Sequence, residues 1–239
     1  KTIIFDLDGV LIESKEIHFK ALNQALPFNY RISYEEHLST YDGLPTKEKL
    51  KLLTQYKDLP EDLYEEIAKN KAKETQNVLF DTIQPRMEFT KIFMCLKNAG
   101  YRIALASNAV RSTVDTALDC LELRKYFDVI YSNQEVERPK PHFEMYFKIM
   151  MDMNSKPSET LILEDSHIGR QAVLDAGCHL LPIIDTYDVK LEKIEAKLAE
   201  LNKQIIVRVP WRSNKMNVLI PMAGAGSRFA EAGYTFPKP

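Results

Sequence analysis

Two acidic residues stand one position apart at the end of an apolar run near the start of the chain. The segment reads "KTIIFDLDGV" and places Asp6 and Asp8 on either side of Leu7. Because alternate residues of an extended chain face opposite ways, the two carboxylates share one side. One carboxylate could then attack phosphorus while the other protonates the leaving oxygen. The competing interpretation is that Asp8 and Gly9 only form a turn.

Three later segments carry polar side chains where strands are expected to end. Ser107 and Asn108 follow "YRIALA", Lys140 lies in "RPKPHF", and Glu164 and Asp165 close "TLILED". The carboxyl ends of parallel strands face one crevice, so these side chains are expected to meet there. Clustered carboxylates require a cation, and Mg²⁺ suits a site made of oxygen ligands. A hydroxyl and an ammonium suit phosphate oxygens, so the set predicts phosphoryl transfer.

The elements that would position these residues follow from hydrophobic periodicity. From residue 87 onward, strand and helix patterns alternate, which predicts an α/β fold built on a doubly wound parallel sheet. Up to residue 81 the pattern after the first strand is helical, with Ser14 expected to cap the first helix, and it predicts a cap over the crevice. The expected divisions are a core of residues 1–14 and 82–186, a helical cap of 15–81, a helix and linker of 187–215, and a last piece of 216–239.

Composition limits the classes of partner. The chain has 239 residues, 45% of them hydrophobic, and a net charge of -2 with basic residues spread along it. This balance argues against nucleic acid or a membrane surface as a partner. Cys95, Cys120 and Cys178 are far apart in apolar contexts, so buried and reduced thiols are expected. With no apolar stretch of membrane length and no basic leader, a cytoplasmic protein is expected.

The four polar segments, taken in order, resemble the four motifs of the haloacid dehalogenase superfamily. They read Asp-x-Asp-Gly, Ser-Asn, Lys and Glu-Asp, and the similarity spans residues 1–186 in the branch with a helical cap after the first motif. The resemblance implies a Rossmann-like core and a Mg²⁺ ion. It implies that Asp6 is the nucleophile and a metal ligand, and that Asp8 is the acid/base with its backbone carbonyl on the metal.

The same resemblance implies roles for the remaining motif residues. Ser107 and Lys140 would bind the transferring phosphoryl group, and Asp165 with Glu164 would complete the metal site. The backbone amides of residues 108 and 109, Asn108 and Ala109, lie near an expected helix start and could add contacts to the anion.

Within that superfamily the cap segment is most similar to beta-phosphoglucomutase-like members. The resemblance implies that Ser14 is at a hinge, that His18 lies near the acid/base, and that Lys71 is a cap lysine. His18 could instead be a packed helix residue and Lys71 a solvated charge. Cap opening is expected to use hinges near residues 11–14 and 79–85.

The segment "YDGLPTKEKL" resembles the substrate loop of those caps and includes Gly43. Thr46 stands where the mutases have an arginine that clamps a second phosphate, with Lys47 beside it. Lys47 could also be only a solvated charge. Because the planar guanidinium suits bidentate phosphate recognition better than a lysine does, its absence favours a phosphatase over a mutase.

The last two dozen residues resemble a different family. "GAGSRFAEAGYTFPKP" is similar to the opening of sugar-phosphate nucleotidyltransferases, and it places Gly224, Gly226, Arg228 and Lys238 where that family contacts nucleotide phosphates. The segment is too short to bury a core, so one hypothesis is a fragment of a longer two-enzyme protein, with the rest of a fused nucleotidyltransferase as a partner. The alternative is a structural tail.

The leading hypothesis is a Mg²⁺-dependent phosphatase that acts on a small phosphorylated sugar or related metabolite. A hexose-phosphate mutase is the alternative among enzymes. A catalytically silent module of a nucleotidyltransferase is the alternative from another class, but such a module would have no physical need to keep so many carboxylates together.

Overall fold

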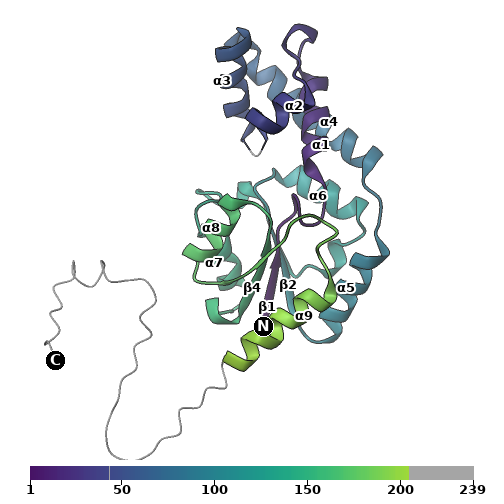
Figure 1. Cartoon of the computed structure of the whole chain (residues 1–239), viewed down its shortest axis with the longest axis vertical. Coiled ribbons are helices and arrows are strands. Elements are labelled where there is room, and N and C mark those ends of the chain that lie inside the picture. The colour runs from purple at the N-terminus through teal and green to yellow at the C-terminus, as the bar shows by residue number, and fades with distance from the viewer. Residues whose placement is uncertain (43, 205–239) are drawn as a thin grey trace, which may run out of the picture. The chain divides into compact units, whose positions relative to one another are not determined.

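A parallel sheet forms the frame of the protein, whose computed structural model describes residues 1–42 and 44–204. Five strands lie in the order β3-β2-β1-β4-β5 (Figure 1). They are β1 (Thr2–Phe5), β2 (Arg102–Ala106), β3 (Val129–Tyr131), β4 (Thr160–Glu164) and β5 (His179–Pro182). Each neighbouring pair is parallel, and Thr2 of β1 pairs with Arg102 on one side and Thr160 on the other. The predicted α/β fold with a parallel sheet is confirmed.

The helices form a group above the sheet and two layers beside it. The first group comprises α1 (Ser14–Ala25), α2 (Tyr34–Glu36), α3 (Thr46–Lys57) and α4 (Tyr64–Thr82), and it lies beyond the carboxyl ends of the strands (Figure 1). Beside the sheet lie α5 (Met87–Asn98) and α6 (Arg111–Cys120) on one face, and α7 (Glu144–Asp152) and α8 (His167–Asp175) on the other. Helix α9 (Leu191–Gln204) follows β5. None of the described helices has the length and apolar character needed to cross a membrane.

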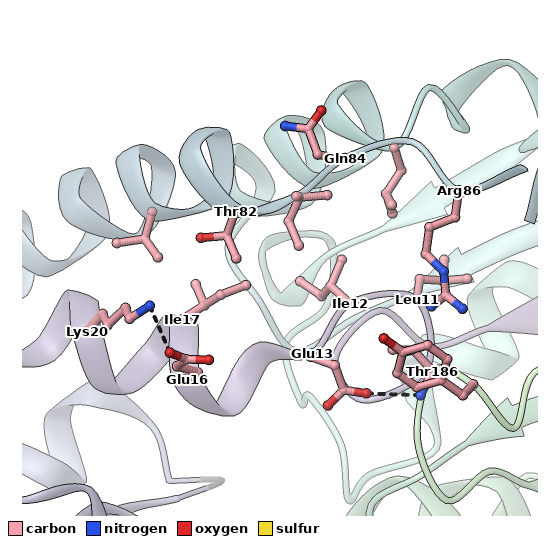
Figure 2. Close-up of a pocket in the computed structure, with 14 residues that line it drawn as sticks. Leu11, Ile12, Glu13, Glu16, Ile17, Lys20, Thr82, Gln84, Arg86 and Thr186 are labelled. Carbon is pink, nitrogen blue, oxygen red and sulfur yellow. Dashed lines mark hydrogen bonds and ion pairs between the residues drawn. The ribbon is translucent and has the colours of Figure 1, made fainter.

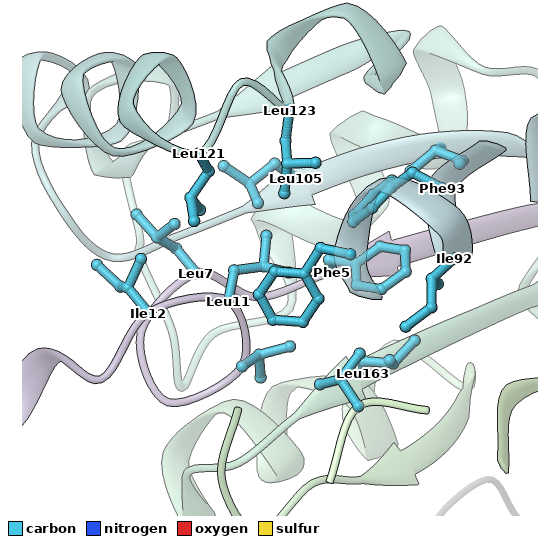
Figure 3. Close-up of a cluster of buried hydrophobic side chains, with 14 of the residues drawn as sticks. Phe5, Leu7, Leu11, Ile12, Ile92, Phe93, Leu105, Leu121, Leu123 and Leu163 are labelled. Atoms are coloured by element: carbon cyan, nitrogen blue, oxygen red, sulfur yellow. The ribbon is translucent and has the colours of Figure 1, made fainter. Parts of the chain in front are cut away.

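The central strand is buried on both faces because it separates two hydrophobic clusters. Phe5 packs with Phe93 and Leu163 on one face (Figure 3), and the two phenyl rings have centroids 4.7 Å apart. Ile4 faces the other cluster, where it meets Tyr146. Burying a side chain of this size contributes roughly 1.5–3 kcal/mol. Packing on both faces therefore fixes the strand that ends at Asp6.

Helices α1 to α4 bury a hydrophobic cluster of their own. Leu22 of α1, Leu50 and Leu53 of α3, and Ile67 of α4 are at most 2% exposed and belong to one cluster. The helical group is thus held together independently of the packing against the sheet. Ser14 is the first residue of α1, and the capping position falls to Glu13, whose side chain makes no capping hydrogen bond. The prediction of a Ser14 cap was wrong, because the helix begins one residue earlier than expected, at Ser14 itself.

The three cysteines are free thiols, as predicted, but they differ in exposure. Cys178 is buried and Cys120 is half-buried, whereas Cys95 is exposed. The prediction of a buried thiol was wrong for Cys95, because α5 packs through Phe89, Phe93 and their neighbours and leaves the Cys95 side to solvent.

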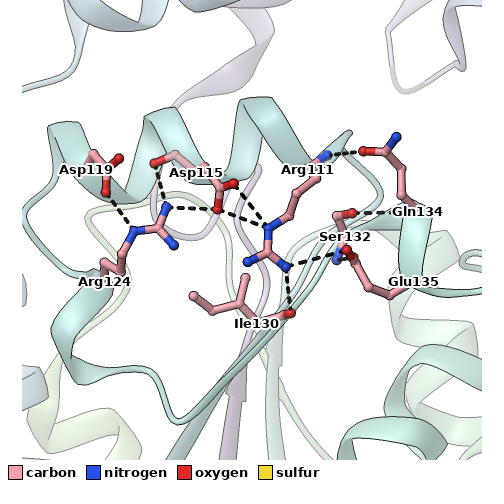
Figure 4. Close-up of polar contacts among 8 residues, drawn as sticks. All are labelled: Arg111, Asp115, Asp119, Arg124, Ile130, Ser132, Gln134 and Glu135. Carbon is pink, nitrogen blue, oxygen red and sulfur yellow. Dashed lines mark hydrogen bonds and ion pairs between the residues drawn. The ribbon is translucent and has the colours of Figure 1, made fainter.

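An ion-pair network fixes the start of α6 against the segment after β3 (Figure 4). The Arg111 guanidinium binds Asp115 through Nε at 3.1 Å and donates to the Ile130 carbonyl at 3.3 Å. The Arg111 backbone N–H donates to Gln134 Oε1 at 2.8 Å. These side chains are partly exposed, so each ion pair adds little stability. Their consequence is positional, because α6 begins four residues after Ser107.

The chain passes twice between the sheet and the helical group, and the loop that contains Thr186 and Tyr187 contacts both of these connections (Figure 2). Thr186 N–H donates to Glu13 Oε1 at 3.1 Å, beside the first crossing. The Arg86 guanidinium carbon lies 4.7 Å from the ring centre of Tyr187, beside the second crossing. A pocket of about 270 Å³ lies between them and is lined by residues from both crossings. The predicted hinges fall here and stay a prediction.

Candidate active site

A buried ammonium lies at the centre of the site. Lys140 Nζ donates to Asp6 Oδ1 at 2.8 Å, to Glu164 Oε2 at 2.8 Å and to the Ala106 carbonyl at 2.9 Å. Burial alone would lower the pKa of Lys140, but the charges of Asp6 and Glu164 raise it well above its usual range. Lys140 therefore remains a cation and joins the ends of β1, β2 and β4.

Glu164 is completely buried and uses both of its carboxylate oxygens. Oε2 also accepts from the Tyr146 hydroxyl at 3.0 Å, and Oε1 accepts from Ser166 N–H at 3.1 Å and from Ser166 Oγ at 2.8 Å. Ser166 Oγ in turn accepts from Gly169 N–H and caps α8. A Cβ on Gly169 would lie 2.0 Å from the Glu164 carboxyl carbon, so the close approach of α8 requires glycine.

Asp6 follows the last residue of β1, and its backbone N–H donates to the Leu163 carbonyl at 3.1 Å. One carboxylate oxygen is held by Lys140, and the hydrogen bonds with described residues leave Oδ2 free. Burial and the charge of Glu164 raise the pKa of Asp6 well above its usual range, although Lys140 opposes this shift. A further cation beside Oδ2 would oppose this shift and favour the ionised, nucleophilic carboxylate.

Asp8 faces cap helix α1. His18 Nε2 lies 3.5 Å from Asp8 Oδ1, and Ser14 is the first residue of the same helix. Burial would raise the pKa of Asp8, but His18 and Ser14 lower it overall. The next residue, Gly9, has φ of +72°, and a Cβ there would lie 2.0 Å from Asp165 Oδ2. Glycine is therefore required both by the turn and by the neighbouring carboxylate.

The segment after β2 forms a tight turn. Ser107 is fully buried, and its Oγ accepts from the Ala109 N–H at 3.0 Å, which leaves the hydroxyl hydrogen to donate elsewhere. The Asn108 amide group donates to the Lys140 carbonyl and accepts from the Lys140 N–H, both at 3.0 Å. Asn108 thus holds the backbone that carries the central ammonium.

Three carboxylates form a candidate cation site. Oxygens of Asp6, Glu164 and Asp165 lie within 4.8 Å of one another. Burial, then the charges of Glu164 and Asp8, raise the pKa of Asp165 to about 6. An all-oxygen cluster that is short of positive charge fits a divalent ion such as Mg²⁺. The donor set therefore matches the predicted cofactor.

The predicted cap residues occupy different environments. His18 lies at Asp8, as described, and Lys71 on α4 is half-buried. Thr46 is half-buried at the start of α3, whereas Lys47 is exposed. Gly43 lies outside the described residues. The tail residues Gly224, Gly226, Arg228 and Lys238 also lie outside them, so the nucleotidyltransferase resemblance stays a prediction.

Sequence reasoning missed four side chains that shape this site. Tyr146 and Ser166 bind Glu164, and the Asn108 side chain holds Lys140, where only its backbone had been considered. Lys49 of α3 is 3% exposed, and burial with the charge of Lys71 lowers its pKa to about 8. The spacing of Lys49 could have indicated that it is buried, because it lies four residues before the buried Leu53 and therefore on the same face of the helix.

Comparison with known proteins assigns this geometry to a family. Residues 3–183 match the family described as haloacid dehalogenase-like hydrolase. A phosphorylated carbohydrates phosphatase from Thermotoga maritima is 28% identical over 178 residues, which cover 74% of this chain and 82% of that protein. Pyrophosphatase PpaX from Bacillus thuringiensis is 26% identical over 176 residues, 70% of this chain and 74% of that protein.

A solved structure agrees at the level of the fold. The crystal structure of beta-phosphoglucomutase from Clostridium difficile is similar with a TM-score of 0.65 and 21% identity, over 86% of this chain and 98% of that one. The family match covers most of the chain and confirms the prediction of a hydrolase enzyme. By its motifs, its sheet and this match, the chain belongs to the haloacid dehalogenase-like hydrolase family.

Proposed function

We propose that this enzyme is a Mg²⁺-dependent phosphatase that hydrolyses a small phosphorylated sugar or related metabolite through an aspartyl-phosphate at Asp6. The observation that carries the proposal is the buried cluster in which Lys140 joins Asp6 and Glu164 beside Asp165. A merely structural module would gain nothing from several carboxylates packed around one ammonium.

In the first half-reaction, Asp6 Oδ2 attacks the phosphorus and the bond to the ester oxygen breaks. Asp8 donates a proton to that leaving oxygen, so the product leaves as an alcohol. The anionic phosphoryl group beside Asp8 raises its pKa from the lowered value of the free enzyme, which favours the protonated acid. Lys140 and the Ser107 hydroxyl hydrogen bind phosphoryl oxygens as charge shifts onto them.

In the second half-reaction, ionised Asp8 takes a proton from a water molecule, and the water oxygen attacks phosphorus. The bond from phosphorus to Asp6 breaks, which regenerates the carboxylate and releases inorganic phosphate. Asp6 and Asp165 would hold Mg²⁺, with Glu164 supporting them through Lys140 and Ser166. When bound, the ion supplies positive charge that keeps Asp6 ionised and neutralises the phosphoryl oxygens.

Two considerations support the substrate class. The relative from Thermotoga maritima is named for phosphorylated carbohydrates, and it matches most of both chains. The cap group α1 to α4 lies over the strand ends and would enclose a small molecule better than a polymer. The sugar part of the proposal rests on that likeness.

A mutase is the second candidate, and one observation favours it. Lys49 brings a buried cation into the cap one helical turn after Thr46, where the mutases have their arginine. A cap that holds a second phosphate is what a bisphosphorylated intermediate requires. The two candidates differ in product, because a mutase gives an isomer and a phosphatase gives free phosphate.

The test is phosphate release from a panel of sugar phosphates, with and without Mg²⁺, for the native chain and for Asp6→Asn. Metal-dependent release that the substitution abolishes is the expected result. An isomerised product without free phosphate would replace the phosphatase with the mutase. Equal release by Asp6→Asn would rule out the aspartyl-phosphate route.

A further inference from the structure

The ammonium of Lys140 already uses all of its hydrogen-bond donors within the described part of the chain. An ammonium carries three N–H groups, and those of Lys140 meet Asp6 Oδ1 at 2.8 Å, Glu164 Oε2 at 2.8 Å and the Ala106 carbonyl at 2.9 Å. The proposed mechanism requires Lys140 to bind a phosphoryl oxygen as well. One of these three hydrogen bonds must therefore be exchanged when the phosphoryl group arrives.

Glu164 is the acceptor that loses least when Lys140 turns away. Its carboxylate also accepts from the Tyr146 hydroxyl at 3.0 Å and from the N–H and Oγ of Ser166. Three donors would thus remain on Glu164, whereas the Asp6 carboxylate accepts from Lys140 alone among the described side chains. Glu164 is completely buried, so solvent cannot replace a missing donor. An unpaired carboxylate oxygen at this place would be unfavourable.

Tyr146 of α7 shares one carboxylate oxygen with Lys140. The tyrosine is fully buried, and its hydroxyl donates to Oε2 of Glu164, the same oxygen that Lys140 binds. The Lys140 ammonium also lies over the tyrosine ring, 5.3 Å from its centre, where the face of an aromatic ring attracts a cation. The ring therefore keeps the ammonium close, and the hydroxyl occupies the oxygen that the ammonium would leave.

We propose that Tyr146 is a positioning residue for phosphoryl transfer: its hydroxyl holds Glu164 Oε2 while Lys140 turns one N–H group from that oxygen to a phosphoryl oxygen. This inference rests on the proposed function and adds a residue to it. The exchange replaces one charge-assisted hydrogen bond of Lys140 with another. Without the hydroxyl, Oε2 would have Lys140 as its only donor among the described residues, so the turn toward the substrate would leave a buried, charged oxygen unpaired.

The experiment removes the hydroxyl and keeps the ring, with Tyr146→Phe. The matched control is Tyr131→Phe, because the Tyr131 hydroxyl also donates to a carboxylate, Asp152 Oδ2, at 2.7 Å. Both variants and the native chain are compared in three measurements: the dissociation constant of inorganic phosphate in the presence of Mg²⁺ by calorimetry, kcat on the best sugar phosphate of the panel, and urea unfolding. Unfolding establishes that each variant is folded in the other two assays.

Tyr146→Phe should weaken phosphate binding and lower kcat, each by about ten- to hundredfold, which is the range for a hydrogen bond to a charged group. Tyr131→Phe should leave phosphate binding and kcat as they are in the native chain, although it also removes a hydrogen bond to a carboxylate. Because the hydroxyl acts through Glu164, Tyr146→Phe should weaken phosphate binding less in a Glu164→Gln background, where a neutral amide holds Lys140 less strongly.

Two results would overturn the role of Tyr146. Phosphate binding and kcat that match those of Tyr131→Phe would mean that Lys140 releases Asp6 or the Ala106 carbonyl instead. An undiminished effect in the Glu164→Gln background would mean that the hydroxyl does not act through Glu164.

Phosphate binding needs no turnover, so it separates this proposal from the proposed function. Phosphate binding that depends on the Tyr146 hydroxyl, without hydrolysis of any sugar phosphate, would refute the phosphatase and keep the exchange. Hydrolysis and phosphate binding that Tyr146→Phe leaves unchanged would do the reverse.

Discussion

Replacing Lys140 with Met tests whether the buried ammonium holds the site together. The substitution keeps a long unbranched side chain but removes the positive charge that meets Asp6 and Glu164, each at 2.8 Å. Both carboxylates are at most 6% exposed, so solvent cannot take over the role of the lysine. Breaking a buried ion pair by removing one partner typically lowers the free energy of unfolding by about 3–5 kcal/mol.

The pH dependence of this loss can be worked out. In the variant, one carboxyl, most readily Asp6 whose pKa is already raised, stays protonated in the folded state. Its folded pKa exceeds its unfolded pKa, so stability falls as pH rises above about 4. Each unit by which the folded pKa exceeds the unfolded one adds about 1.4 kcal/mol to the loss at a pH above both values. The loss should be larger at pH 8 than at pH 5.

Urea unfolding of metal-free protein at pH 5 and pH 8 measures these losses, and phosphate release at neutral pH measures activity. Lys140→Met should be inactive, and the double variant with Glu164→Gln should recover part of the stability because one carboxylate has become neutral. The reasoning would be refuted if Lys140→Met unfolded within 1 kcal/mol (about the median worth of a surface pair) of the native chain at pH 8. It would also fail if Glu164→Gln deepened the loss.

Three further perturbations have defined outcomes. Gly169→Ala should destabilise the protein by about 1–3 kcal/mol and lower kcat, because its Cβ would overlap the Glu164 carboxyl, and urea unfolding with the exposed Lys91→Ala as control measures this. Asn108→Ala should lower kcat more than it raises KM, since Asn108 positions the Lys140 backbone and not the substrate. His37 of the cap is fully buried, and burial with the charge of Lys49 lowers its pKa to about 4. Its folded pKa lies below the unfolded value, so stability should fall by up to about 3 kcal/mol as pH drops from about 6.5 to about 4, and His37→Phe should remove that part of the slope.

Each of these has an outcome that contradicts it. Unchanged unfolding of Gly169→Ala would mean that α8 moves away from β4 at little energetic expense. A pure KM effect in Asn108→Ala would make the amide a substrate ligand. An identical pH slope of unfolding in His37→Phe and the native chain would mean that the buried imidazole finds a proton-binding partner despite its lack of hydrogen bonds among the described residues.

The order of strand-end residues could be predicted because it depends on local patterns. Parallel strands bring their carboxyl ends to one edge, so the sequence indicated that Asp6, Ser107 and Glu164 would meet without any knowledge of distance. Lys140 follows no strand directly, but its segment lies between an expected strand and an expected helix, so it was predicted to reach the same crevice. The places of the strands were also predictable, since apolar runs mark the buried strands β1 and β4, whereas the runs at β3 and β5 extend beyond the strands themselves.

What could not be predicted depends on contacts between elements. A lysine in a helix is normally read as solvated, and only the packing of α3 against α4 makes Lys49 buried while Lys47 stays exposed. The hydrogen bonds to both Glu164 oxygens could not be predicted either, because they depend on where α7 places Tyr146 and where the start of α8 places Ser166. Periodicity predicts which face of an element is apolar, but not which side chain of another element completes a polar contact.

The two glycines that face Glu164 and Asp165 limit which substitutions the protein can tolerate. Gly9 leaves the space that the Asp165 carboxylate fills, and Gly169 leaves the space that the Glu164 carboxylate fills. Neither glycine has a side chain that could react, yet an added side-chain carbon would displace an acidic group of the proposed site. In a saturation library selected for turnover, positions 9 and 169 should therefore be as intolerant as the acidic positions themselves. The intolerant positions in such a library would therefore include residues that make room for the carboxylates as well as the carboxylates themselves.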